Sequence, residues 1–211
     1  MKYYDIVTAL EKSPGDKHGK ALGSKIGDIP KEANQHNYGV IYDQLFNSQY
    51  LKKGGPLSIL EIGIKCGHSI KVWEECTLFD RVVGVDHTKR EDFDKIHNWK
   101  GYIFSDKVEL IYDKDAYDEN FVKSLQEQNY KFDIILDDGS HLFQDQIKFF
   151  NIYIDLLNIG GVIICEDISA GYMPQLIELS KQNKHFHIFD LRNNVNLGNN
   201  DIIAILRKEY D

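Results

Sequence analysis

The chain has 211 residues, which suits one domain with an appended arm rather than two full domains. Apolar residues make up 42% and charged residues 27% of the chain, and these fractions exclude collagen-like, coiled-coil and wholly disordered proteins. The 25 Lys and Arg residues against 33 Asp and Glu residues give a net charge of −8, which argues against a nucleic-acid partner.

Cysteine usage and hydropathy predict the cellular setting. Cys66, Cys76 and Cys165 are odd in number and form no CxxC pair, so a reducing cytoplasm is expected rather than a disulfide framework or a zinc site. The first residues carry charges throughout and lack the apolar region of a signal peptide. No apolar run approaches the ~20 residues that cross a bilayer, so we predict a cytoplasmic protein with no membrane partner.

The first part of the chain, residues 1–55, reads as an N-terminal arm, and residues 56–211 read as the main domain. Residues 13–33 are rich in Gly, Lys, Asp and Pro and predict a loop. A helix that packs near the first strand and covers the active face is predicted next, because apolar residues recur there at helical spacing. These residues are Tyr38, Ile41, Tyr42, Leu45 and Phe46.

Short apolar, β-branched runs recur through the main domain, and the first six start about 25 residues apart, the length of a strand plus a crossover helix. Continuous apolar runs indicate strands covered on both faces, as in a parallel sheet. The predicted strands cover residues 57–62, 81–86, 108–112, 132–137, 161–166, 185–190 and 201–206.

Helical patterns fill the gaps between these runs. Residues 118–128 and 173–182 read as helices, and a short helix is expected after Gly67. One apolar stripe predicts a further helix that ends at Gly160-Gly161. The stripe consists of Phe143, Ile147, Phe150, Ile154 and Leu157.

The last connection, residues 191–200, is ten residues long and rich in Asn and Gly. A parallel crossover needs a dozen or more residues, so this segment can form only a hairpin. The seventh strand should therefore run antiparallel to the sixth, at one end of an otherwise parallel sheet. The predicted fold class is α/β, a three-layer sandwich with a seven-stranded, mostly parallel sheet.

The first motif, Glu61-Ile-Gly63-Ile-Lys-Cys-Gly67-His-Ser69, follows the first strand. Gly63 allows a sharp turn and close approach of a ligand, and the next helix offers free amide groups at its N-terminus. Asp86 ends the next strand, where a carboxylate can accept both ribose hydroxyls of an adenosine ligand. A turn that merely links strand and helix is the alternative.

Two adenosine ligands compete for this motif, a dinucleotide and S-adenosylmethionine. A dinucleotide needs a glycine where the backbone meets the pyrophosphate, but residues 64–66 (Ile-Lys-Cys) are bulky there. S-adenosylmethionine has no pyrophosphate and is therefore favoured.

The second motif, Asp137-Asp138-Gly139-Ser140-His141, follows the fourth strand, and Glu166-Asp167 follows the fifth. The carboxyl ends of neighbouring parallel strands face one crevice, so these groups should converge. Carboxylates suit Mg²⁺, and His141 could accept a proton from a metal-bound hydroxyl. Singly, such an Asp could cap a helix and the His could bond its own loop. Clustered acids, however, repel one another unless a cation lies among them.

The run DIILDDGSH, a helix and then LLNIGGVIICEDI resembles the Mg²⁺-dependent sugar O-methyltransferases. Known members of that family methylate deoxysugars on macrolide antibiotics such as mycinamicin. The match spans residues 133–168, and weaker similarity covers EIG…G.S at 61–69, GVD at 84–86 and the Asp115-Ala116-Tyr117 segment. The antiparallel last strand likewise resembles the class I methyltransferase variant of the Rossmann fold.

The resemblance implies roles for individual residues. Asp138, Glu166 and Asp167 would hold Mg²⁺, and His141 would be the general base beside Asp138. The S-adenosylmethionine site would be lined by Glu61, Gly63, Gly67, Ser69, Asp86, Asp115 and Ala116, with Tyr38 from the arm.

The expected function is S-adenosylmethionine- and Mg²⁺-dependent O-methylation of a vicinal diol on a sugar, sugar-nucleotide or glycoside. Family members form dimers or tetramers, so a homo-oligomer is expected. The alternatives are a catechol or other small-diol acceptor and a non-catalytic, cofactor-binding partner subunit; an NAD-dependent oxidoreductase ranks last. Tyr172, just past Glu166-Asp167, could form a substrate wall or pack within the fold.

Overall fold

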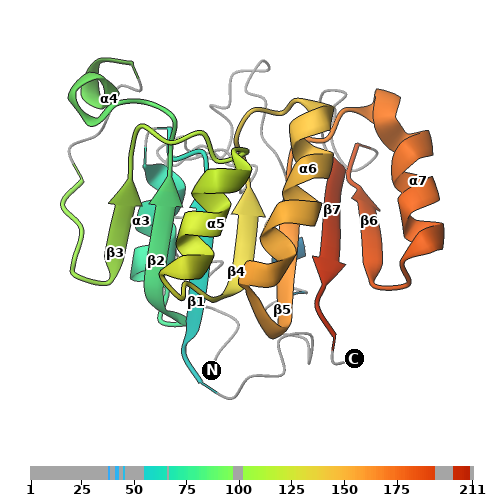
Figure 1. Cartoon of the computed structure of the whole chain (residues 1–211), viewed down its shortest axis with the longest axis horizontal. Helices are drawn as coiled ribbons and strands as arrows, with labels where there is room; N and C mark the ends of the chain where they lie inside the picture. Colours follow the sequence, from blue (N-terminus) through green and yellow to red (C-terminus); the bar gives the residue numbers. More distant parts are fainter. Residues whose placement is uncertain are drawn as a thin grey trace, which may run out of the picture.

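The computed structural model in Figure 1 describes Tyr38, Ile41, Tyr42, Leu45 and residues 55–65, 67–96, 102–192 and 202–209. The predicted loop 13–33, as well as Phe46 and Cys66, lies outside the described residues, as does most of the connection 191–200. The predicted boundary between arm and main domain at residue 55 stays a prediction. No helix in the described part of the chain is long and apolar enough to span a membrane.

Seven strands among the described residues form one sheet, in the order β3-β2-β1-β4-β5-β7-β6. The strands are β1 (Leu57–Ile62), β2 (Phe79–Val85), β3 (Val108–Ile111), β4 (Phe132–Asp137), β5 (Leu157–Cys165), β6 (Phe186–Asp190) and β7 (Ile202–Arg207). Neighbours from β3 to β5 pair in parallel, and β7 pairs antiparallel with both β5 and β6. The mostly parallel sheet and its antiparallel last strand are therefore confirmed.

The position of β7 differs from the prediction. It lies between β5 and β6, so β6 and not β7 forms the edge of the sheet. The first four residues of β7, Ile202 to Ile205, are all buried, whereas most of β6 is only partly buried. A continuous apolar run needs neighbours on both sides and both faces, and the half-polar sequence of β6 suits an edge.

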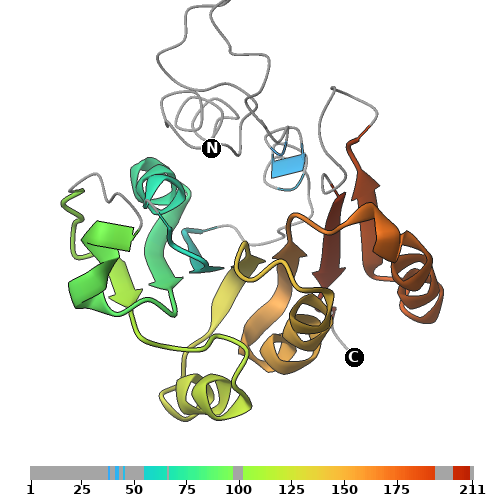
Figure 2. The ribbon, with the colours of Figure 1, turned by 90° about the horizontal axis from the view of Figure 1, so that it is seen from above.

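Helices cover both faces of the sheet, which makes three layers (Figure 2). The helices α3 (His68–Glu75) and α4 (Arg90–Ile96) share one apolar cluster with strand residues such as Ile59. On the other face, α5 (Glu119–Glu127), α6 (Phe143–Tyr153) and α7 (Met173–Gln182) share a second cluster with residues such as Leu60. Consecutive strand residues thus enter opposite cores, as period-2 geometry requires. The sequence analysis did not predict α4.

The described arm residues belong to the core of the α3 face. Tyr38, Ile41, Tyr42 and Leu45 are all buried, in the same cluster as the strand residue Ile164. Ile41, Tyr42 and Leu45 have helical conformation, as their spacing predicts. These arm side chains therefore pack, together with α3 and α4, against one face of the sheet.

The prediction that a helix continues to Gly160-Gly161 was wrong. The helix α6 ends at Tyr153, a 3₁₀ turn η1 (Ile154–Leu156) follows, and β5 has begun by Leu157. Gly160 has a φ of 81° within β5, where the register against β4 shifts. Its amide donates to Lys208 O at 2.7 Å, in the segment that follows β7. Gly160 therefore belongs to an irregularity within strand β5 and does not end a helix.

The turn after β1 lies against the turn after β4. Gly63 has a φ of 91°, and a Cβ atom there would lie 2.2 Å from the backbone oxygen of Asp138. The Asp138 amide donates to Ile62 O at 3.0 Å, which holds the two turns together. Both the backbone conformation and this close approach require glycine.

Comparing Gly63→Ala with Gly160→Ala separates these two requirements. Gly160 also has positive φ, but nothing lies within 4 Å of its added Cβ, so its substitution should cost about 1–2 kcal/mol of strain. Gly63→Ala should cost this strain plus about 1–3 kcal/mol for displacing backbone. Urea unfolding of both variants measures the difference, and equal losses would contradict the contact.

Candidate active site

Apart from Tyr38 of the arm, the predicted site residues lie at or after the carboxyl ends of β1, β2, β3, β4 and β5, which run in one direction (Figure 1 shows the arrows of β2, β3 and β4). Parallel pairing brings these ends to one edge of the sheet, where open α/β folds bind their ligands. The loops are also tied to one another, because Gly63 N donates to Val85 O at 2.9 Å and Lys114 N donates to Asp86 O at 3.2 Å.

An acid–histidine cluster, made of Asp138, His141 and Asp167, lies at the ends of β4 and β5. Each offers one ligand atom, and these atoms all lie within 4.8 Å of one another. His141 Nδ1 lies 3.3 Å from Asp167 Oδ2, and His141 Nε2 lies 3.9 Å from Asp138 Oδ1. His141 and Asp167 have φ values of 56° and 54°, a conformation costly for non-glycine residues that surrounding contacts must hold.

Two tyrosines of the arm hold the acids that follow β5. The Tyr42 hydroxyl donates to Glu166 Oε1, and the Tyr38 hydroxyl donates to Asp167 Oδ1. Asp167 N in turn donates to the Tyr38 oxygen at 3.3 Å. The sequence predicts a role at the cofactor for Tyr38 and no site role for Tyr42, although the position of Tyr42 four residues after Tyr38 on the same helical face was the available signal.

The predicted metal ligands are therefore brought together only in part. Asp138 and Asp167 share the cluster with His141, while the buried Glu166 carboxylate accepts a hydrogen bond from Tyr42. Two carboxylates this close repel each other unless a cation lies nearby. Two carboxylate ligands with room for water fit Mg²⁺, and the histidine, a poor Mg²⁺ ligand, can then act on a proton. The donor set fits a hard divalent cation.

The glycine turn after β1 is held by Asp86. Its buried carboxylate accepts from Ile64 N at 3.0 Å and Lys65 N at 3.2 Å through Oδ2, and from Thr88 N at 2.8 Å through Oδ1. Asp86 thus shapes the predicted cofactor loop, and its predicted contact with ribose stays a prediction.

The other predicted cofactor residues lie around this turn or in the loop after β3. Glu61 is buried and accepts from Trp73 Nε1 at 2.7 Å, which ties β1 to α3. Gly67, with a φ of 74°, precedes α3, and Ser69 lies in its first turn, partly exposed. In the loop after β3, Asp115 is exposed and Ala116 is buried.

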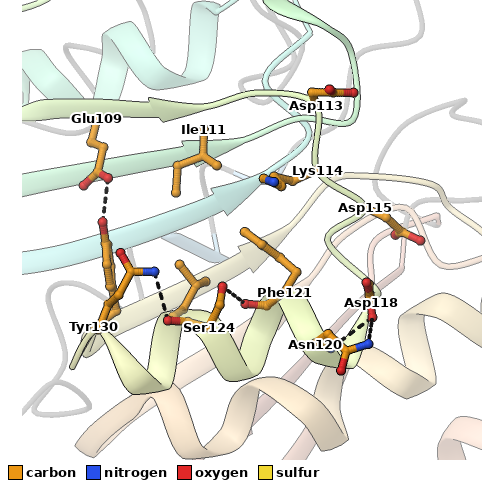
Figure 3. A pocket seen from close by; sticks show the side chains of 12 residues that line it. Glu109, Ile111, Asp113, Lys114, Asp115, Asp118, Asn120, Phe121, Ser124 and Tyr130 are labelled. Atoms are coloured by element: carbon orange, nitrogen blue, oxygen red, sulfur yellow. Dashed lines mark hydrogen bonds between the residues drawn. The ribbon is translucent and has the colours of Figure 1, made fainter.

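A groove of about 660 Å³ lies between β3 and α5 (Figure 3). Asp113, Asp115 and Asp118 lie near the carboxyl end of β3, whereas Glu109 and Tyr130 lie toward its other end. The acid–histidine cluster does not line this groove. The groove therefore meets the predicted cofactor residues at Asp115, and the acid–histidine cluster lies outside it.

An aromatic pair follows His141. The rings of Phe143 and Tyr172 stack with centroids 4.0 Å apart at 5°, and Tyr172 is 37% exposed. Leu142, between His141 and Phe143, is 60% exposed. Tyr172 thus packs within the fold and also presents part of its surface to solvent beside the cluster.

The two aspartates of the DDGSH run have different surroundings. Asp137 is buried, accepts from the Tyr117 hydroxyl at 2.6 Å and from Gly139 N at 3.1 Å, and lies near Cys165 Sγ. Burial raises the pKa of Asp137 to about 6, and the neighbouring Asp138 carboxylate adds to this increase. Asp138, in contrast, is only partly buried and belongs to the acid–histidine cluster.

Asp137 should make stability fall as pH rises. Its ordinary pKa of 3.8 becomes about 6 on folding, so the native state binds the extra proton between these values. This contribution is complete below the unfolded pKa and is lost as pH rises through the folded one. In EDTA, the stability of wild type relative to Asp137→Asn should therefore drop by roughly 2.5 kcal/mol between pH 4 and 7. Urea unfolding measures it, and a difference independent of pH would contradict it.

Comparisons with known proteins find relatives of this chain by sequence and by fold. No protein-family model matches the chain. The 8-demethyl-8-(2-methoxy-alpha-L-rhamnosyl)-tetracenomycin-C 3'-O-methyltransferase of Streptomyces olivaceus is 27% identical over 170 residues, 74% of this chain and 40% of that protein. A second protein of Streptomyces olivaceus, the 8-demethyl-8-alpha-L-rhamnosyl tetracenomycin-C 2'-O-methyltransferase, is 24% identical over 66% of this chain and 35% of its own length. The chain thus spans less than half of these relatives.

Solved structures of MycE, a methyltransferase from the mycinamycin biosynthetic pathway, superpose on nearly the whole chain. The complex with Mg and SAH gives a TM-score of 0.65 at 17% identity, over 97% of this chain and 55% of that one. The complex that also holds mycinamycin VI gives 0.64 over 97% and 54%. The chain has the Rossmann-like class I methyltransferase fold, and its resemblance to sugar O-methyltransferases extends through both sequence and fold.

Proposed function

We propose that this chain carries out S-adenosylmethionine- and Mg²⁺-dependent O-methylation of a sugar hydroxyl. One observation carries the proposal: Asp138, His141 and Asp167 converge within 4.8 Å beside the glycine turn that Asp86 holds. The same fold in MycE accompanies Mg and SAH, and the curated relatives are named as O-methyltransferases of rhamnosyl groups.

Two bound groups would supply chemistry that side chains lack: a sulfonium methyl group as electrophile, and a cation that lowers the pKa of a coordinated hydroxyl. Asp138 and Asp167 would hold the cation, and Glu166 would join them if its carboxylate turned from Tyr42. Gly63 and the N-terminus of α3 would receive the amino-acid end of the cofactor. Asp86 and Asp115 would receive its adenosine.

His141 would take the proton of the hydroxyl whose oxygen attacks the methyl group. An imidazole can accept a proton near neutral pH, which a sugar hydroxyl does not readily surrender to water. Asp167 Oδ2, 3.3 Å from His141 Nδ1, would stabilise the imidazolium that forms. Tyr38 restrains Asp167 and would thereby keep this pair aligned. The exposed surfaces of Leu142 and Tyr172 would receive the apolar face of the acceptor.

Cofactor and metal can be tested together on the purified chain. Titration calorimetry should show S-adenosylhomocysteine bound in the micromolar range, about −8 kcal/mol, and no binding of NAD. Methyl transfer to a panel of rhamnosides and other glycosides should stop in EDTA and resume with Mg²⁺. Binding of S-adenosylhomocysteine should survive EDTA, because Asp86 and the glycine turn lie outside the acid cluster. Full turnover in EDTA would overturn the metal's role, and binding of NAD alone would overturn the cofactor.

His141→Ala should lower kcat by about 10²–10⁴-fold, the usual contribution of a general base. It should unfold at nearly the wild-type temperature and bind S-adenosylhomocysteine normally, because His141 is partly exposed. His185→Ala is the matched control, since His185 also lies beside an acid, Glu209 at 4.0 Å, but at the start of β6. A variant that keeps its turnover and loses thermal stability would make His141 a structural residue.

A further inference from the structure

Tyr117 joins two loops that the proposed function uses separately. It follows Asp115 and Ala116 in the loop after β3, and its hydroxyl donates to Asp137 Oδ1 at 2.6 Å. The same oxygen accepts from Ser140 N at 3.0 Å, one residue before His141. One hydroxyl therefore binds both the end of β4 and the loop that carries the proposed base.

The loop after β4 is shaped around this hydroxyl. A Cβ atom at Gly139 would lie 2.4 Å from the Tyr117 oxygen and 3.1 Å from Asp137 Oδ1. The Gly139 amide also donates to Asp137 Oδ1, at 3.1 Å. Asp137 thus accepts bonds from Tyr117 and Gly139 at one oxygen, and the loop leads from there into the unfavourable left-handed conformation of His141.

Tyr117 is equally fixed on the side of the loop after β3. Its amide donates to Asp115 Oδ1 at 2.9 Å, and the Tyr153 hydroxyl donates to Ala116 O at 2.8 Å. Lys114 N donates to Asp86 O, which continues the chain of contacts to the end of β2. Burial and the Asp137 carboxylate raise the pKa of Tyr117, so its hydroxyl keeps the proton that it donates.

We propose that Tyr117 is a positioning residue that couples cofactor binding at Asp115 and Ala116 to the placement of His141. The inference rests on the proposed function. A ligand that orders the loop after β3 restrains Tyr117, and Tyr117 restrains Ser140 through a direct hydrogen bond. His141 then has fewer orientations available when the cofactor is bound, so base and cofactor are aligned together.

Tyr117→Phe removes the hydroxyl and keeps the ring, and Tyr153→Phe is the matched control. Tyr153 is buried, and its hydroxyl donates to Ala116 O in the loop after β3 rather than to a group in the loop after β4. Hydrogen exchange at residues 139–141 is measured with and without S-adenosylhomocysteine. Wild type and Tyr153→Phe should show slower exchange on binding, whereas Tyr117→Phe should exchange faster and gain no protection. Its Kd for S-adenosylhomocysteine should change by less than about threefold.

Turnover gives a second readout. Tyr117→Phe should lower kcat by about 10–100-fold with little change in the KM for the cofactor, because a displaced base weakens the chemical step rather than binding. Gly139→Ala pushes the hydroxyl away from the other side and should reproduce the faster exchange if Tyr117→Phe folds poorly. If wild type, Tyr153→Phe and Tyr117→Phe all bind S-adenosylhomocysteine and gain equal protection at residues 139–141, the coupling alone is overturned. Absence of its binding to wild type would overturn the proposed function and the coupling with it.

Discussion

The contact between the turns after β1 and β4 is the constraint on which the rest of the site depends. At Gly63 the two backbones approach so closely that a Cβ atom would lie 2.2 Å from Asp138 O. This approach puts the turn shaped by Asp86 directly beside the residue that begins the acid–histidine cluster. Parallel pairing of β1 with β4 makes the contact inevitable, since both strands end at the same edge of the sheet.

Three acids at the ends of β4 and β5 accept hydrogen bonds from tyrosines. Tyr117 donates to Asp137, Tyr42 to Glu166 and Tyr38 to Asp167. A neutral hydroxyl satisfies a carboxylate without cancelling its charge, so the edge remains negative and suited to a cation. Tyr117 lies in the loop after β3 whereas Asp137 ends β4, and Tyr38 and Tyr42 belong to the arm whereas their acids follow β5. The same hydrogen bonds therefore hold separate segments together.

The loops proposed to bind the cofactor and the acid–histidine cluster thus form one connected structure. Asp86 ties the turn after β1 to the end of β2, Lys114 extends the connection to the loop after β3, and Tyr117 carries it to the loop after β4. Such connectivity matters for group transfer, because donor, acceptor and base must be aligned at once.

The sequence by itself determined the strands, the parallel core and the edge at which the acids gather, because apolar runs and strand-end residues are local patterns. It could not decide which way each acid points. Asp137 turns inward and Asp138 outward, and the tyrosine partners of Glu166 and Asp167 lie 124 and 129 residues away in the sequence. It also misplaced β7 and Gly160, since the choice of edge strand and the strand irregularity depend on which distant backbone offers hydrogen bonds. These features exist only once the chain has folded, because their causes are contacts between segments that local patterns do not connect.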